Sequence, residues 1–69
     1  MMEFYQTVVR NGTTGETELI VWQSSKFELC LEHARTIMYQ TKINPAQIDI
    51  LFLNEAGLWE SIWGEGGMA

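Results

Sequence analysis

The chain has few of the features that stabilise a small protein covalently or attach it to a membrane. Its 69 residues contain one cysteine and one proline, so no disulfide can form within the chain. It also has no secretory leader pattern and no long apolar run. We therefore expect one small domain with a marginally stable core, in the reducing cytoplasm and not on a membrane.

Basic residues are scarce as well. Four Lys and Arg stand against nine Asp and Glu, which gives a net charge of −5. Because Lys and Arg are the residues that neutralise phosphates, this balance argues against direct binding to nucleic acid or to an anionic membrane. Two interpretations of the acidity remain open, namely solubility and a protein partner with a basic surface.

Catalytic, nucleotide-binding and metal-binding signatures are missing from the sequence. The glycines form neither G-x-x-x-x-G-K-[ST] nor G-x-G-x-x-G. Cys30 and His33 are three residues apart on a predicted helix, but two ligands do not make a metal site, and Cys30 lies in an apolar stripe where its thiol should be inert. We therefore expect a non-enzymatic protein without cofactor or metal.

Residue periodicity predicts four strands and one helix. Residues 3–10, 17–23 and 58–63 alternate in side-chain direction with period two, whereas residues 48–53 are nearly continuous apolar sequence, as is typical of a central strand. Ser25 and Glu28 fit a capping box at a helix start, and Asn44 followed by Pro45 ends the helix region. The apolar stripe of this helix consists of Phe27, Cys30, Leu31, Ala34, Ile37, Met38 and Thr41.

The order β-β-α-β-β predicts a single α+β domain over residues 1–63, followed by a flexible tail over residues 64–69. Its simplest arrangement is a four-stranded, antiparallel-rich sheet with one helix on one face. A β-grasp-like strand order of 2-1-4-3 is the first expectation.

One helix covers only one face of such a sheet, yet apolar side chains alternate onto both faces. The uncovered face predicts an interface, either with a second copy as a homodimer or with another protein, unless irregular segments fold over it. The predicted anchors are Trp22, Trp59 and Trp63, although each could instead be a core residue. Glu55 and Glu60 add the acidic contacts for a basic partner.

Two resemblances bear on fold and function. Residues 43–47, leading into Leu51 and Phe52, resemble the passage from helix to third strand in ubiquitin-like β-grasp proteins, and Gly66-Gly67 resembles their conjugation tail. This resemblance implies the fold, with a structural or modifier role as the alternative function. In size, acidity and element order, the chain also resembles small phage-encoded inhibitors, including anti-CRISPR proteins. That resemblance implies an inhibitor in the host cytoplasm that binds a host nucleic-acid-binding or defence protein.

Overall fold

Two strands, a helix and two further strands follow one another in the structure, in the order that the sequence predicts. The computed structural model describes residues 3–40 and 43–63, so Thr41 and the predicted tail over residues 64–69 lie outside the described part. The elements are β1 Tyr5–Arg10, β2 Thr17–Ser24, α1 Phe27–Gln40, the short 3₁₀ helix η1 Pro45–Gln47, β3 Ile48–Leu53 and β4 Trp59–Ser61. The predicted α+β class, with one helix and a four-stranded antiparallel sheet, is confirmed.

The strand order differs from the expected one. The sheet runs β2-β1-β3-β4, with every neighbouring pair antiparallel, so the predicted order 2-1-4-3 is wrong. The most apolar strand decides this arrangement. In the order 2-1-4-3, β3 would lie at an edge, whereas pairing with β1 gives it a neighbour on each side and leaves the short β4 at the edge.

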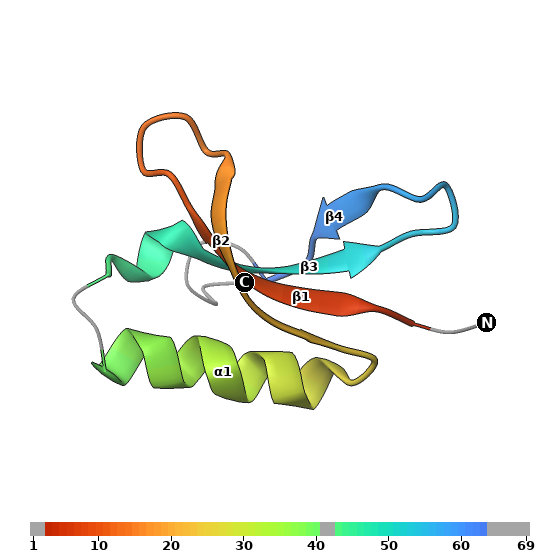
Figure 1. The fold of residues 1–69 in the computed structure, drawn as a ribbon, viewed down its shortest axis with the longest axis horizontal. Helices are drawn as coiled ribbons and strands as arrows, with labels where there is room; N and C mark the ends of the chain where they lie inside the picture. Colours follow the sequence, from red (N-terminus) through yellow and green to blue (C-terminus); the bar gives the residue numbers. More distant parts are fainter. Residues whose placement is uncertain (1–2, 41–42, 64–69) are drawn as a thin grey trace.

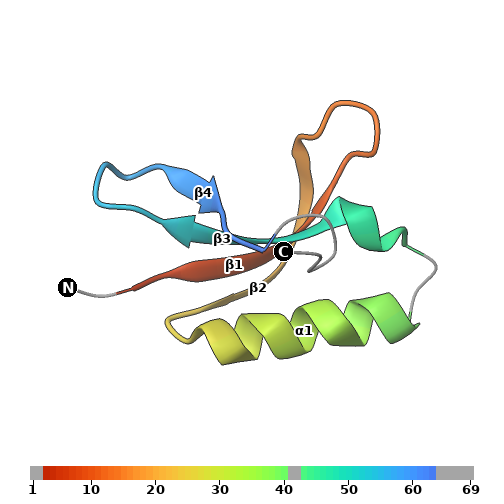
Figure 2. The same ribbon diagram turned by 180° about the vertical axis from the view of Figure 1, so that it is seen from behind.

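The helix packs on one face of the sheet, and the two hairpin loops rise away from it on the other side, as both ribbon views show (Figures 1 and 2). The Thr7 hydroxyl fixes which face of β1 lies under α1, because it donates to the Cys30 carbonyl oxygen at 2.7 Å. Across the β1–β3 ladder, Tyr5, Thr7 and Val9 lie opposite Phe52, Ile50 and Ile48. Partners in a ladder share a face, so all six residues point toward the helix.

The core between α1 and the sheet uses the predicted helix stripe. Its buried residues are Cys30, Ala34, Ile48 and Ile50, and its half-buried neighbours are Tyr5, Phe27, Leu31, Ile37, Met38, Ile43 and Trp63. The predicted capping box is not the contact that begins the helix. Ser24 provides the hydroxyl, which accepts from the Lys26 amide at 3.0 Å, and Ser25 makes no side-chain hydrogen bond in the described part of the chain.

Candidate interaction surfaces

The exposed apolar residues lie mainly along the two edges of the sheet. In the centre of the face opposite α1, Val8 and Leu51 are buried, and so is Asp49. The Arg10 guanidinium binds Asp49 there, with Nη2 2.7 Å and Nε 3.0 Å from Oδ2. Large apolar side chains that remain exposed are Phe4, Leu19, Ile20, Trp22, Leu29, Tyr39, Leu58, Trp59 and Ile62. Six of these nine belong to β2, to β4 or to the residues that flank β4.

The first surface lies on the β3–β4 hairpin. We call Leu58, Trp59 and Ile62 the hairpin patch; these residues are 64%, 39% and 42% exposed. Trp59 lies opposite Leu53 in the β3–β4 ladder, on the face away from α1, whereas Glu60 lies opposite Phe52 on the helix face. Trp59 and Glu60 are therefore neighbours on the same short strand, and their side chains point to opposite faces of the sheet.

The Asn54 side chain holds the loop of this hairpin in place. Its Oδ1 accepts from the amides of Ala56 at 2.9 Å and Leu58 at 3.0 Å, and its Nδ2 donates to the Glu60 carboxylate at 3.0 Å. Gly57 takes a φ of +79°, a left-handed conformation that favours glycine. Because one side chain satisfies several loop groups at once, Glu55 and Leu58 are presented on an ordered turn.

In the β1–β2 hairpin, the Asn11 side chain makes the equivalent hydrogen bonds. Its Oδ1 accepts from the amides of Thr13 at 2.7 Å and Thr14 at 2.9 Å, and its Nδ2 donates to the Glu18 carboxylate at 2.6 Å. The Arg10 Nη1 also donates to the Gly15 carbonyl oxygen, which ties the loop to the ion pair on the sheet. In each hairpin an asparagine thus orients the loop and a glutamate on the returning strand. The only signal for this in the sequence is an asparagine at the end of one strand and a glutamate six or seven residues later.

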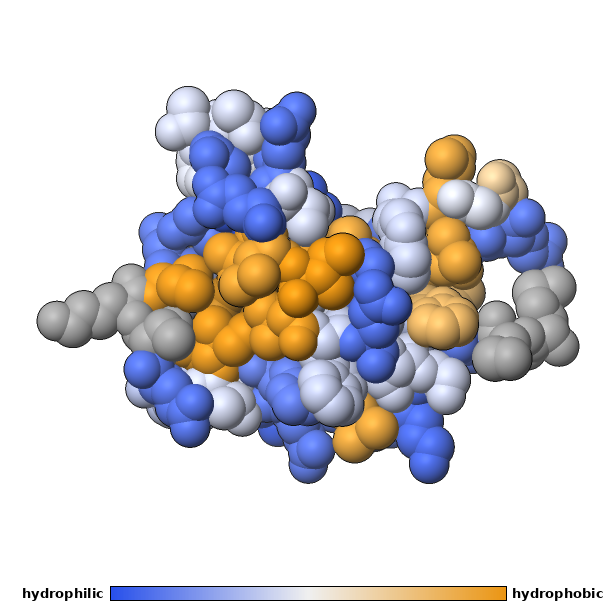
Figure 3. Space-filling view, viewed as in Figure 1, coloured by the Kyte–Doolittle hydropathy of each residue, from blue (hydrophilic) through white to orange (hydrophobic). Residues whose placement is uncertain are grey.

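The second surface lies on β2. We call Leu19, Ile20 and Trp22 the edge patch; these residues are 56%, 47% and 42% exposed. Figure 3 shows a continuous apolar area over β2, between the first hairpin loop and α1, and a second group over the β3–β4 hairpin. The Trp22 indole stacks on the His33 imidazole of α1, with the ring centroids 4.0 Å apart, and this contact holds the indole against the helix.

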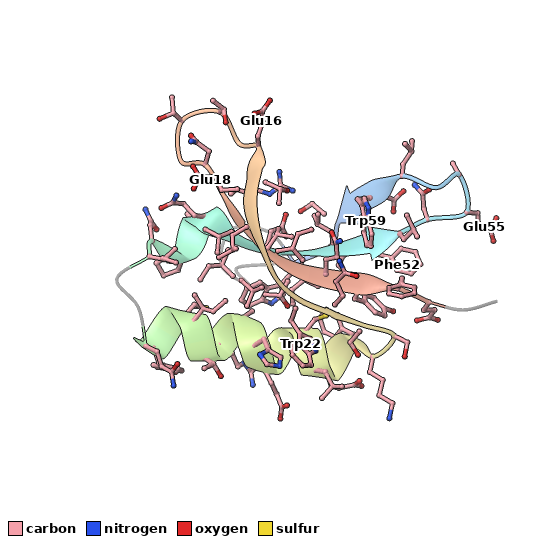
Figure 4. All side chains as sticks on the ribbon, viewed as in Figure 1. Glu16, Glu18, Trp22, Phe52, Glu55 and Trp59 are labelled. Carbon is pink, nitrogen blue, oxygen red and sulfur yellow. The ribbon has the colours of Figure 1, made fainter. Side chains whose placement is uncertain are left out.

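The three predicted tryptophan anchors do not form a single site. Trp22 lies on β2 and faces α1, because its ladder partner is Thr7, whereas Trp59 lies on the opposite edge and the opposite face. Figure 4 shows the two indoles apart, on different strands. Trp63 is half-buried and packs against the core cluster, so it serves the core and not an exposed surface.

Negative charge is concentrated at the two hairpin ends. Glu16 and Glu18 lie on the first hairpin and Glu55 on the second, as Figure 4 shows. Arg10 is the one basic residue of the two described hairpins, and its charge is already paired with Asp49. The hairpin ends therefore offer carboxylates that form no ion pair within the described part of the chain, on the same hairpins as exposed apolar side chains.

Cys30 and His33 occupy different environments. Cys30 is fully buried, and burial raises the pKa of its thiol above the ordinary value. His33 lies against Trp22 at the surface of α1. Within residues 3–40 and 43–63, no group of three or more His, Cys, Asp or Glu side chains could hold a metal ion. In the same ranges, no helix is long and apolar enough to cross a membrane.

Comparison of the chain with protein-family models, with curated proteins and with solved structures gives no match.

Proposed function

We propose that this protein is a non-enzymatic binding module that uses the β3–β4 hairpin to hold a basic surface on another protein. The observation that supports this proposal best is the hairpin patch on its ordered loop. Three large apolar residues stay exposed there, and Glu55 and Glu60 lie on the same hairpin. Exposed apolar clusters on small proteins mark interaction sites, and aromatic anchors supply much of the binding energy.

The acidic hairpin ends select the chemistry of the partner. Carboxylates around an apolar patch steer a basic surface toward it and fix its orientation, and they repel phosphates. The partner class that fits is therefore a nucleic-acid-binding protein whose own basic site is occupied by the module. The resemblance to phage-encoded inhibitors adds that such a partner would be a host enzyme or defence protein.

Affinity capture with matched variants tests this proposal. The immobilised protein should retain a basic protein from host lysate, and retention should fall with added salt. Trp59→Ala should abolish retention because it removes the aromatic anchor. Tyr39→Ala is the control, because Tyr39 is 89% exposed on α1, far from the hairpin patch in the fold, and should bind as the wild type does.

Direct mobility-shift assays complete the test. Duplex and single-stranded DNA and RNA should show no shift at low salt, since few basic residues are available to neutralise phosphates. A shift at micromolar protein concentration would contradict the proposal and would make the exposed tryptophans candidates for base stacking. Equal retention of one protein by the wild type and by Trp59→Ala would exclude the hairpin patch as the binding surface.

A further inference from the structure

The edge strand β2 has the properties of a strand that pairs with another copy of itself. It is the longest strand, with eight residues, and none of them is buried. It pairs with β1 on one side only, and in the described part of the chain no strand lies along its outer edge. A long edge with apolar side chains and free backbone groups is a template for strand pairing.

The order of polar and apolar residues in β2 is symmetric about the centre of the strand. In Thr17–Ser24, four central apolar residues are flanked on each side by two polar ones. In an antiparallel pair centred between Ile20 and Val21, Leu19 would lie opposite Trp22 of the second copy, and Glu18 would lie opposite its Gln23. Apolar residues would then meet apolar ones, and the two Glu18 carboxylates would be kept apart.

The bulge in β2 makes this pairing geometrically consistent. A two-fold axis perpendicular to a sheet keeps its faces, so paired residues must point to the same face. Leu19 and Trp22 are three residues apart and would point to opposite faces of a regular strand. The β1–β2 ladder shifts register twice, between Thr7 and Val8 and, at Glu18 of β2, between Val9 and Arg10. Because of the first shift, Leu19 pairs with Val9 and Trp22 with Thr7, and both therefore face α1.

From this geometry we propose that two copies of the chain associate through β2, antiparallel and in this register, and form one continuous eight-stranded sheet. The small size of the core favours a second copy of the chain as the partner of β2, because a dimer would bury apolar residues that one copy leaves exposed. Among the described residues seven apolar residues are buried, whereas nine large apolar residues are exposed. The four central residues of β2 are also uncharged, so two copies can pair there without placing like charges opposite each other.

Sedimentation velocity with variants of β2 tests the proposal. The wild type should have the mass of a dimer at tens of micromolar. Leu19→Lys should give a monomer, because it places a charge opposite Trp22 of the second copy, and the control Leu58→Lys should remain a dimer. Circular dichroism should show that both variants stay folded.

A charge change at Gln23 tests the register and does not depend on the folding of Leu19→Lys. The lysine of Gln23→Lys would face Glu18 of the second copy twice in each dimer, so the dissociation constant of the dimer should fall about threefold to tenfold. Gln23→Glu should raise this constant by a similar factor. The corresponding Tyr39→Lys and Tyr39→Glu variants change the net charge equally on exposed α1, and they should have much smaller effects. A monomeric wild type, a dimer that survives in folded Leu19→Lys, open-ended aggregates, or equal effects at Gln23 and Tyr39 would each overturn the proposal.

Discussion

Replacing Asp49 by Asn should destabilise the fold by about 2 kcal/mol, because it leaves the Arg10 guanidinium without its charged partner. The Asp49 side chain is 4% exposed, and its Oδ2 accepts two hydrogen bonds from Arg10 while Oδ1 accepts one from the Ile50 amide. Breaking a fully buried pair costs roughly 3–5 kcal/mol, but the Arg10 side chain is 32% exposed and can recover some hydration.

Chemical denaturation of the variants measures the change in the free energy of unfolding. In thermal unfolding, the melting temperature of Asp49→Asn should be roughly 8–16 °C below that of the wild type. Arg10→Gln and the double variant complete a thermodynamic cycle, in which the coupling between the two side chains should exceed about 1 kcal/mol. Glu32→Gln, which neutralises an exposed carboxylate on α1, is the control and should change the free energy of unfolding by less than about 0.5 kcal/mol. Equal stability of Asp49→Asn and Glu32→Gln would refute the reasoning, because it would mean that the ion pair adds nothing to the sheet.

Three further predictions concern the helix start, a loop and the thiol. Ser24→Ala should lower the free energy of unfolding by about 0.5–1 kcal/mol, whereas Ser25→Ala should leave the denaturation midpoint unchanged, because the Ser24 hydroxyl binds the Lys26 amide. Gly57→Ala should cost about 1 kcal/mol in the same assay, because its φ of +79° strains any residue with a Cβ although no atom lies within 4 Å. The Cys30 thiol should react with a disulfide reagent only after unfolding. Because burial raises the pKa of the Cys30 thiol, the protonated thiol contributes fully to stability below the pKa of the unfolded thiol, and this contribution is lost as the pH rises above that value. The free energy of unfolding of Cys30→Ala should therefore lack this alkaline loss.

Local patterns in the sequence were sufficient to predict the four strands, the helix and the apolar stripe of the helix, but not which face of each strand points to the helix. The apolar stripe of α1 depends on the side-chain period of one element and is seen in the structure, whereas β1, predicted from its alternation, is a strand whose four inner residues are all buried. The hairpin partners were also predictable, because short turns join them. Leu29 lies exposed on the outer side of the helix, as its position in the helical period predicts.

The strand order and the location of the exposed surface depend on contacts between distant residues. A carboxylate at position 49 inside an apolar strand gives no sign that it will meet Arg10, which lies 39 residues earlier in the chain. That ion pair lies on the outer face, where Val8 and Leu51 are also buried, and the exposed apolar side chains lie mainly at the edges instead. The bulge that turns Leu19 and Trp22 to one face is likewise a property of the β1–β2 register and not of the β2 sequence alone.

The two edges of the sheet differ in a way that separates the two proposed contacts. β4 is three residues long and carries Glu60 at its centre, which disfavours pairing with its own copy, whereas the four central residues of β2 are uncharged. In a sheet joined through β2, β4 would remain the outer edge on both sides, so each hairpin patch would stay free. Leu19→Lys should therefore abolish the dimer and keep the partner bound with one molecule per monomer, whereas Trp59→Ala should abolish partner binding and keep the dimer, as measured by light scattering with and without the captured partner. Loss of both properties in either variant, with the fold intact, would show that dimer and partner share one surface.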